Sequence, residues 1–337
     1  MKRLIAILLS IFLLATLTVG CKKEEKEESK YVDGGMKIAT STGDFASYTQ
    51  DLKKKIDYLA ESGFRYADLR LYNSSDMEPF LKDNWKEYAK EIKDYAATKN
   101  ITFVQAHAIG GNAFKDETSY NNIVKNTIRG IEVCKELGIP NIVVHPGNSS
   151  DMDKEAYFAA NKDFYAEFFK TMEETGVNVL VENSSQTMIG HYCIDTGADL
   201  REFLEYVNHP QLKACWDTGH ANIEGDQYYE ILDIGDLLAG IHISDNLGDE
   251  DNHMMPYQGT VNFDEVLTAL VQIGYEGAFT FECENNVIYG SNWLNSRNDF
   301  DKSMKVYAPP IEIKISMEKT MLEIGEYMLT QYDIPLG

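Results

Sequence analysis

The sequence is poor in basic residues: 31 Lys and Arg stand against 54 Asp and Glu among 337 residues, a formal net charge of −23. Proteins bind nucleic acids largely through Lys and Arg clusters that neutralise phosphates. A nucleic-acid partner is therefore not expected. Hydrophobic residues make up 44% of the chain and charged residues 25%, which is ordinary for a globular protein with a large core.

Cysteines are few, and they lack the paired spacing that is typical of a structural metal site. The chain has five, and four of them, Cys134, Cys193, Cys215 and Cys283, are scattered through its length. Three of these four lie in or beside apolar runs, where a buried thiol is common. We therefore predict no disulfide.

The beginning of the chain has the pattern of a bacterial export signal. Lys2 and Arg3 precede an uncharged apolar run over residues 4–19, which ends at Gly20 and Cys21. A run of about sixteen apolar residues is short for a membrane-spanning helix and better suited to cleavage. The segment resembles a lipoprotein signal, with Cys21 as the lipid acceptor.

Three parts of the chain follow from this pattern. Residues 22–30, KKEEKEESK, offer no apolar side chain to bury and are typical of a solvated tether. We expect a signal peptide over residues 1–20, the lipidated cysteine with a flexible charged tether over 21–35, and one folded domain over 36–337. The protein would be an extracytoplasmic, membrane-anchored lipoprotein at the cell surface or on the periplasmic face.

Apolar, β-branched runs alternate with amphipathic helical patterns after the tether, which predicts repeated βα units and a parallel sheet. The predicted strands cover residues 36–40, 66–71, 102–106, 141–144, 178–181, 212–216, 239–241 and 278–281. Eight units in this length favour an α/β fold of the (β/α)8 TIM barrel type. An open doubly wound sheet rarely needs eight strands, and the chain has no Gly-rich phosphate loop.

Metal-binding residue types follow six of these strands. In chain order they are His107, His145, Glu182, Asp217 with His220, His242, and Glu282. In a barrel this edge carries the active site, and buried carboxylates cost several kcal/mol unless they are paired or coordinated. A single His after a strand is more often a hydrogen-bonded residue than a ligand, so the interpretation depends on the whole set. The set indicates a divalent cation, and two imidazoles would complete a site for Mn²⁺, Mg²⁺, Co²⁺ or Zn²⁺.

Several motifs in the second half of the chain have a familiar order: VEN, WDTGH, HISDN, DNHMMPYQGTVNF and GYEGAFTFE. With them the sequence resembles the xylose isomerase-like superfamily, specifically its sugar phosphate isomerase/epimerase group, which shares a fold with type IV apurinic endonucleases. The resemblance covers nearly all of the mature chain. It implies a metal site made by Glu182, Asp217, His242 and Glu282, with His220 near the substrate or a second metal.

The resemblance also implies further metal positions. Asp251 and His253 match the D-x-H pair that holds an additional zinc in the endonuclease branch, while His107 and His145 match other zinc positions there. A site with several metals is therefore one expectation, and contact of these side chains with substrate is the other.

Sugar isomerisation or epimerisation moves a proton on a carbon next to a carbonyl, which requires an acid, a base and stabilisation of the enediolate oxygen. We predict that Glu182 and Glu282 act as acid and base besides binding the metal. His220 would hydrogen-bond a substrate oxygen. Tyr72 and Trp216 are candidate substrate contacts, and core packing is an equal expectation for Trp216.

Two departures limit the resemblance. Characterised ketose 3-epimerases of this fold have a Glu six residues after the first ligand and an Arg six residues after the ligand histidine, whereas this chain has Met188 and Gly248. Ketose 3-epimerase activity in particular is therefore not predicted. The long segment over residues 285–311, which contains Trp293, is expected to be either a lid or a surface insertion.

Three alternative functions stay open. A lyase or hydrolase acting on keto-glycosides would use the same proton abstraction. An endonuclease IV-like phosphodiesterase would use the same ligands, although net charge and location oppose it. A non-catalytic sugar-binding lipoprotein would not need so many convergent ligands. The expected partners are a carbohydrate substrate, the membrane through Cys21 and a second copy of the chain in a homo-oligomer.

Overall fold

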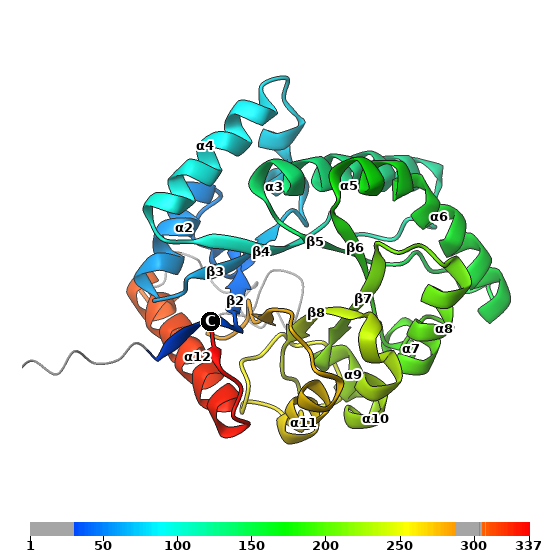
Figure 1. Cartoon of the computed structure of the whole chain (residues 1–337). Helices are drawn as coiled ribbons and strands as arrows, with labels where there is room; N and C mark the ends of the chain where they lie inside the picture. Colours follow the sequence, from blue (N-terminus) through cyan, green and yellow to red (C-terminus); the bar gives the residue numbers. More distant parts are fainter. Residues whose placement is uncertain (1–29, 288–302, 304, 307) are drawn as a thin grey trace, which may run out of the picture.

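The computed structural model describes residues 30–287, 303, 305–306 and 308–337 (Figure 1). Eight parallel strands close into a barrel in sequence order, since the first strand pairs with both the second and the last. They are β2 (Ile38–Ser41), β3 (Tyr66–Arg70), β4 (Thr102–His107), β5 (Asn141–Val144), β6 (Asn178–Glu182), β7 (Leu212–Asp217), β8 (Leu238–Ile243) and β9 (Phe279–Phe281). The predicted TIM barrel and its single domain are confirmed.

Helices surround the barrel (Figure 1). The α-helices are α2 (Leu52–Glu61), α3 (Ser74–Met77), α4 (Trp85–Thr98), α5 (Glu117–Leu137), α6 (Lys154–Thr175), α7 (Gln186–Ile189), α8 (Gly197–Val207), α9 (Thr218–Glu224), α10 (Tyr228–Ile234), α11 (Phe263–Ile273) and α12 (Ile311–Gln331), and the 3-10 helices are η1 (Thr42–Phe45), η2 (Glu78–Leu81) and η3 (Gly235–Leu237). Their ends have local causes. The Asp153 carboxylate caps the start of α6, and Gly176, with φ at 76°, ends it.

The inside of the barrel has an apolar layer below a polar one. Val143, Leu180 and Cys215 form a small buried cluster of their own. Because side chains alternate along a strand, the residue two positions after Leu180 or Cys215 points to the same side. Glu182 and Asp217 therefore point into the barrel one layer nearer its mouth, above the apolar floor.

The chain enters the barrel at the end opposite that mouth. β1 (Tyr31–Met36) lies outside the barrel and bridges to Leu336 near the C-terminus. The Arg65 guanidinium stacks 3.8 Å from the centre of the Tyr31 ring, and the Tyr31 hydroxyl donates to Glu326. The folded part therefore begins earlier than the predicted boundary at residue 36, because an aromatic residue in the supposed tether has packing partners.

Two other predictions concern residues that the structure does not describe. The signal peptide and Cys21 lie outside the described residues, as does most of the 285–311 segment with Trp293.

The four cysteines of the described part, Cys134, Cys193, Cys215 and Cys283, are buried and free. Among the helices that the structure describes, none is both long enough and apolar enough to cross a bilayer.

Candidate active site

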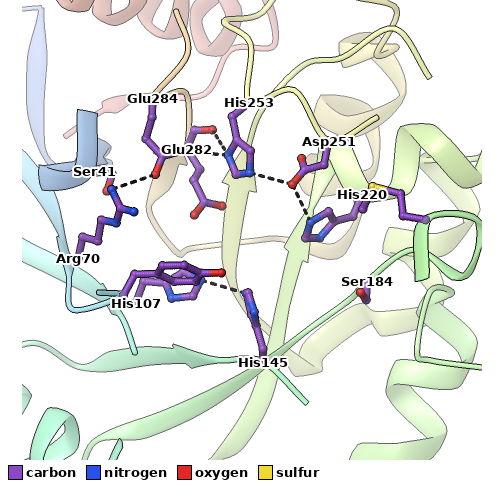
Figure 2. Close-up of a pocket in the computed structure, with 12 residues that line it drawn as sticks. Ser41, Arg70, His107, His145, Ser184, His220, Asp251, His253, Glu282 and Glu284 are labelled. Atoms are coloured by element: carbon purple, nitrogen blue, oxygen red, sulfur yellow. Dashed lines mark hydrogen bonds and ion pairs between the residues drawn. The ribbon is translucent and has the colours of Figure 1, made fainter. Parts of the chain in front are cut away.

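The mouth of the barrel holds a pocket (Figure 2). Its lining includes six of the predicted strand-end and loop residues, the predicted Tyr72, and several residues that were not predicted. The lining residues are Ser41, Arg70, Tyr72, His107, His145, Ser184, Met188, His220, Asp251, His253, Glu282 and Glu284. The candidate site thus lies where a TIM barrel carries its active site.

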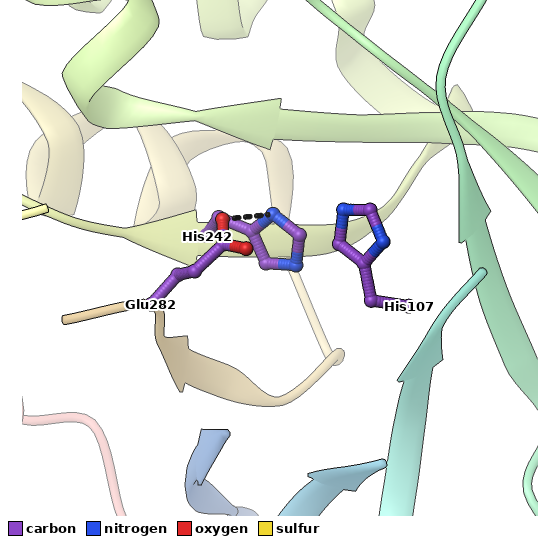
Figure 3. Close-up of side chains that lie close together, drawn as sticks. All are labelled: His107, His242 and Glu282. Atoms are coloured by element: carbon purple, nitrogen blue, oxygen red, sulfur yellow. Dashed lines mark ion pairs between the residues drawn. The ribbon is translucent and has the colours of Figure 1, made fainter. Parts of the chain in front are cut away.

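The four predicted metal ligands converge below this pocket. One ligand atom from each of Glu182, Asp217, His242 and Glu282 lies within 4.8 Å of the others. His242 Nδ1 is 2.5 Å from Glu182 Oε1 and 3.0 Å from Glu282 Oε2. Figure 3 shows the His242 ring beside Glu282, with the His107 ring next to it. The rings of His107 and His242 are nearly parallel, with 5.6 Å between their centres. Strands far apart in sequence therefore deliver one compact donor set.

Two further donor groups flank the first. On one side, His145 Nε2 is 2.8 Å and His107 Nε2 is 3.6 Å from Glu182 Oε2. On the other side, the ligand atoms of Asp217, His220 and Asp251 lie within 4.8 Å of one another. Glu182 and Asp217 each take part both in the central group and in a flanking one.

His253 extends the second flanking group. Its Nε2 atom is 2.8 Å from Asp251 Oδ2, and His220 Nε2 is 3.4 Å from the same oxygen. All nine residues predicted as metal ligands or as alternative metal or substrate contacts are therefore brought together at one end of the barrel.

Asp217 has one oxygen engaged and one free. As N-cap of α9, its Oδ1 atom accepts from the backbone N–H of His220 at 2.7 Å, and its own N–H donates to Asn183 Oδ1 at 2.6 Å. Oδ2 is buried and has no hydrogen-bond donor among the residues that the structure describes. This buried carboxylate oxygen lies beside Glu182, His242 and Glu282, and a divalent cation would supply the partner that it lacks.

The site residues strongly perturb one another's pKa values. Burial alone would raise the pKa of Glu182 and Glu282, but the charge of His242 holds both well below the usual range. Burial raises the pKa of Asp217 to about 6, against the charge of His220. Burial would lower the pKa of His242, yet neighbouring acids raise it well above normal. A divalent cation bound among these groups would compete with protons on the imidazoles.

The two predicted aromatic contacts have different places. Tyr72 lines the pocket and packs edge-on against His107 and His145. Trp216 is fully buried in the core, where its Nε1 donates to Gln227 at 3.2 Å. The prediction of a substrate contact for Trp216 is corrected, because it lies one residue before Asp217 and so points to the opposite side of β7.

Sequence reasoning missed several residues of the site. Arg70, Glu284 and Ser41 line the pocket. Gln105 and Asp68 are buried, and Gln105 Nε2 lies 2.9 Å from His242 Nε2. The sequence did contain a signal for Gln105, because it precedes His107 by two positions on β4 and both side chains point into the barrel. A polar residue at such an inward position indicates a side chain that contacts the site residues.

The chain matches the family described as xylose isomerase-like TIM barrel over residues 56–308, which is most of its length. The chain belongs to this family. A curated relative, the inosose isomerase of Halalkalibacterium halodurans, is 25% identical over 69% of this chain and 82% of its own length. The ketose 3-epimerase of Arthrobacter globiformis is 30% identical, over 46% of this chain and 53% of its own length. Sugar isomerases and epimerases are thus among its relatives.

Solved structures agree on the fold. D-psicose 3-epimerase of Clostridium cellulolyticum H10, solved with D-tagatose, superposes with a TM-score of 0.67 and 21% identity, covering 87% of this chain and 99% of that one. The IOLI protein, solved with a zinc atom, gives 0.68 and 20%, covering 88% and 99%. At these identities the likeness concerns the barrel itself.

Proposed function

We propose that the protein is a metal-dependent sugar isomerase or epimerase that transfers a proton on a carbon next to a carbonyl. The observation that carries the proposal is the convergence of Glu182, Asp217, His242 and Glu282 beneath an open pocket. Its inosose isomerase and ketose 3-epimerase relatives support a sugar as substrate.

The donor set fits a divalent cation. Three carboxylates and one imidazole, with an orphaned Asp217 oxygen among them, suit Mn²⁺, Mg²⁺, Co²⁺ or Zn²⁺. When bound, such an ion supplies Lewis-acid polarisation of the substrate carbonyl and holds its oxygens in place.

The residues of the chain have distinct tasks in this proposal. Glu282 lines the pocket with 17% of its side chain exposed, whereas the Glu182 side chain is 1% exposed. Glu282 therefore meets the substrate directly and takes or returns the carbon-bound proton, with Glu182 as its acid–base counterpart. His220 donates to a substrate oxygen from the opposite wall, and Tyr72 limits the space beside the imidazoles.

The flanking groups would hold additional cations. His107, His145 and Glu182 offer one donor set, and Asp217, His220 and Asp251 offer another. Their donors are N and O atoms, as in the central group, so a second or third ion would extend the positive field over the pocket. If they stay metal-free, the same imidazoles would hydrogen-bond substrate oxygens.

The flanking donor groups also favour a second candidate, metal-dependent hydrolysis of a phosphodiester, because additional cations held there would stabilise attacking and leaving oxygens. Net charge opposes a nucleic-acid substrate for it. A keto-glycoside lyase or hydrolase would use the proton transfer of the first proposal. We further propose that the protein is a lipoprotein anchored at Cys21 and facing the extracytoplasmic space.

The test compares metal content and turnover of the wild type, Glu282→Gln and the exposed control Glu323→Gln, using neutral ketoses, 3-keto-glycosides and a phosphodiester. We expect divalent metal in the wild type and the control. Glu282→Gln should lose turnover of sugars by roughly 10²- to 10⁴-fold, the usual contribution of a general acid or base. A metal-free wild type, or equal rates for all three proteins, contradicts the proposal. Faster cleavage of the phosphodiester would favour the second candidate.

A further inference from the structure

A chain of alternating charges crosses one wall of the pocket. Lys55 on α2 lies 3.2 Å from Asp76, and Asp76 lies 3.9 Å from the Nε atom of Arg70. Arg70 Nη1 is 3.5 Å from Glu284 Oε1, and Glu284 Oε2 is 3.3 Å from His253 Nδ1. The positive charge of Arg70 is thus compensated on both sides by carboxylates of the protein.

Arg70 is built into this wall. Its backbone N–H donates to Thr42 Oγ1 at 2.9 Å, and Gly43 leaves room for the side chain, because a Cβ atom there would lie 2.6 Å from Arg70 Cδ. Among the described lining residues it is the sole Lys or Arg. Its side chain is 14% exposed. The ion pairs that its guanidinium makes with described residues, at 3.9 Å and 3.5 Å, are longer than good hydrogen bonds. Its donors stay available to a ligand.

Glu284 and Ser41 complete this wall. The Glu284 side chain is 21% exposed, and its backbone carbonyl accepts from the buried Lys314 ammonium at 3.3 Å. Ser41 Oγ accepts from the N–H of Gly43 at 2.9 Å, which leaves its hydrogen to donate. Figure 2 shows Arg70 and Ser41 on the opposite side of Glu282 from His220. The wall therefore lies at one end of the pocket, with the proposed reacting centre between it and His220.

We propose that Arg70, Glu284 and Ser41 form a subsite for a vicinal diol of an uncharged sugar, and that the substrate carries no phosphate or carboxylate at this end. The inference rests on the proposed sugar function and adds the substrate class to it. A diol can donate one hydroxyl to the Glu284 carboxylate and accept from the Arg70 guanidinium. A phosphate or carboxylate would have to lie against Glu284, in a wall whose one guanidinium is already compensated.

The first experiment measures binding by calorimetry to the metal-loaded protein. The probes are D-tagatose and D-fructose, each beside its 6-phosphate, and the proteins are the wild type, Glu284→Gln and the exposed control Glu323→Gln. We expect the wild type and the control to prefer the neutral sugars by at least about ten-fold. Glu284→Gln removes the carboxylate that compensates Arg70 on the pocket side and leaves Asp76 behind it, so it should shift that preference toward the phosphates by about ten-fold or more.

The second experiment uses Arg70→Gln, with the neutral sugar that the wild type turns over best. Loss of hydrogen bonds to a charged group weakens binding by roughly ten- to hundred-fold. We therefore expect KM to rise by about that factor, with kcat and metal content nearly unchanged. A deoxy analogue that lacks one hydroxyl of the diol should raise the KM of the wild type by the same factor. In Arg70→Gln, removing that hydroxyl should raise KM little further, because the contact is already lost.

Three results overturn the proposal: tighter binding of the phosphates by the wild type, an unchanged preference in Glu284→Gln, or no binding of any sugar. Metal content and turnover are measured on the same samples, so the proposed function is decided separately. A protein that turns over only phosphorylated sugars would keep that function and lose this subsite. One that binds neutral sugars without turnover would keep the subsite and lose the function.

Discussion

At the scale of single residues, the orientation of His242 depends on a side chain beneath it. Gln105 is 2% exposed, and its amide lies 2.9 Å from His242 Nε2. This contact leaves the other ring nitrogen, Nδ1, directed toward Glu182 and Glu282. Partners behind a ligand histidine usually set its tautomer and ring orientation. Gln105 is therefore a positioning residue for the proposed metal site.

We predict that Gln105→Leu weakens divalent metal binding by about 10- to 100-fold, the usual effect of losing such a partner. Titration of the metal-free protein with Mn²⁺ or Zn²⁺ measures the affinity, and circular dichroism checks the fold. Gln105→Glu keeps a side-chain oxygen at this position and should retain more affinity than Gln105→Leu. Equal metal affinity in the leucine variant and the wild type would rule out this role for Gln105.

At the scale of elements, α12 anchors the segment that follows β9. Lys314 on this helix is 1% exposed and lies 2.8 Å from Glu318 Oε1, 2.7 Å from Asn286 Oδ1 and 3.3 Å from the Glu284 carbonyl. Burial, followed by the charge of Glu318, raises the pKa of nearby Asp44 well above normal. One buried ammonium thus connects the last helix to the strand end that carries Glu282.

Lys314→Met should destabilise the protein by about 3–5 kcal/mol, because it leaves the buried Glu318 carboxylate without its counter-charge. Urea unfolding of the two proteins measures the difference in the free energy of unfolding. The double variant Lys314→Met/Glu318→Leu should recover much of the loss, since both charges are then removed together. A single variant within about 1 kcal/mol of the wild type would contradict an anchoring role.

At the scale of the whole molecule, the chain enters at one end of the barrel and the pocket opens at the other. Met36 leads into the N-terminal end of β2, whereas the site residues follow the C-terminal ends of the strands. A proposed tether over residues 22–30 would reach at most roughly 30 Å when fully extended. The net charge of −23 opposes close contact with anionic lipid headgroups. An anchor at Cys21 would therefore leave the pocket facing away from the membrane.

If Cys21 carries the lipid, Cys21→Ala should move the protein out of the membrane fraction of the producing bacterium or block removal of its signal. Cell fractionation and incorporation of a labelled fatty acid measure both effects. Ser29→Ala, in the tether, is the matched control and should remain membrane-bound and labelled. Equal membrane association of Cys21→Ala and the wild type, with no label in either, would exclude lipidation at this cysteine.

Local patterns were sufficient to predict the eight strands, the closed barrel and the ligand types at the strand ends. The reason is that hydrophobic alternation is encoded over a few residues, and the barrel brings every strand's C-terminal end to one mouth. Glu182 and Asp217 could be proposed as ligands because each one is the residue that directly follows an apolar strand pattern. The sequence alone thus indicated which strand-end residues would gather at the mouth of the barrel.

Tertiary structure decided how those residues are arranged and which others join them. Trp216 is a core residue because side chains alternate along β7, so it points to the opposite side from Asp217. Glu182 is shared between donor groups because neighbouring strands bring their ligands to it. The pairing of Arg70 with Glu284 joins β3 to the end of β9, 214 positions apart. No local pattern encodes such a contact, since it exists only once the barrel closes and brings the ends of these strands together.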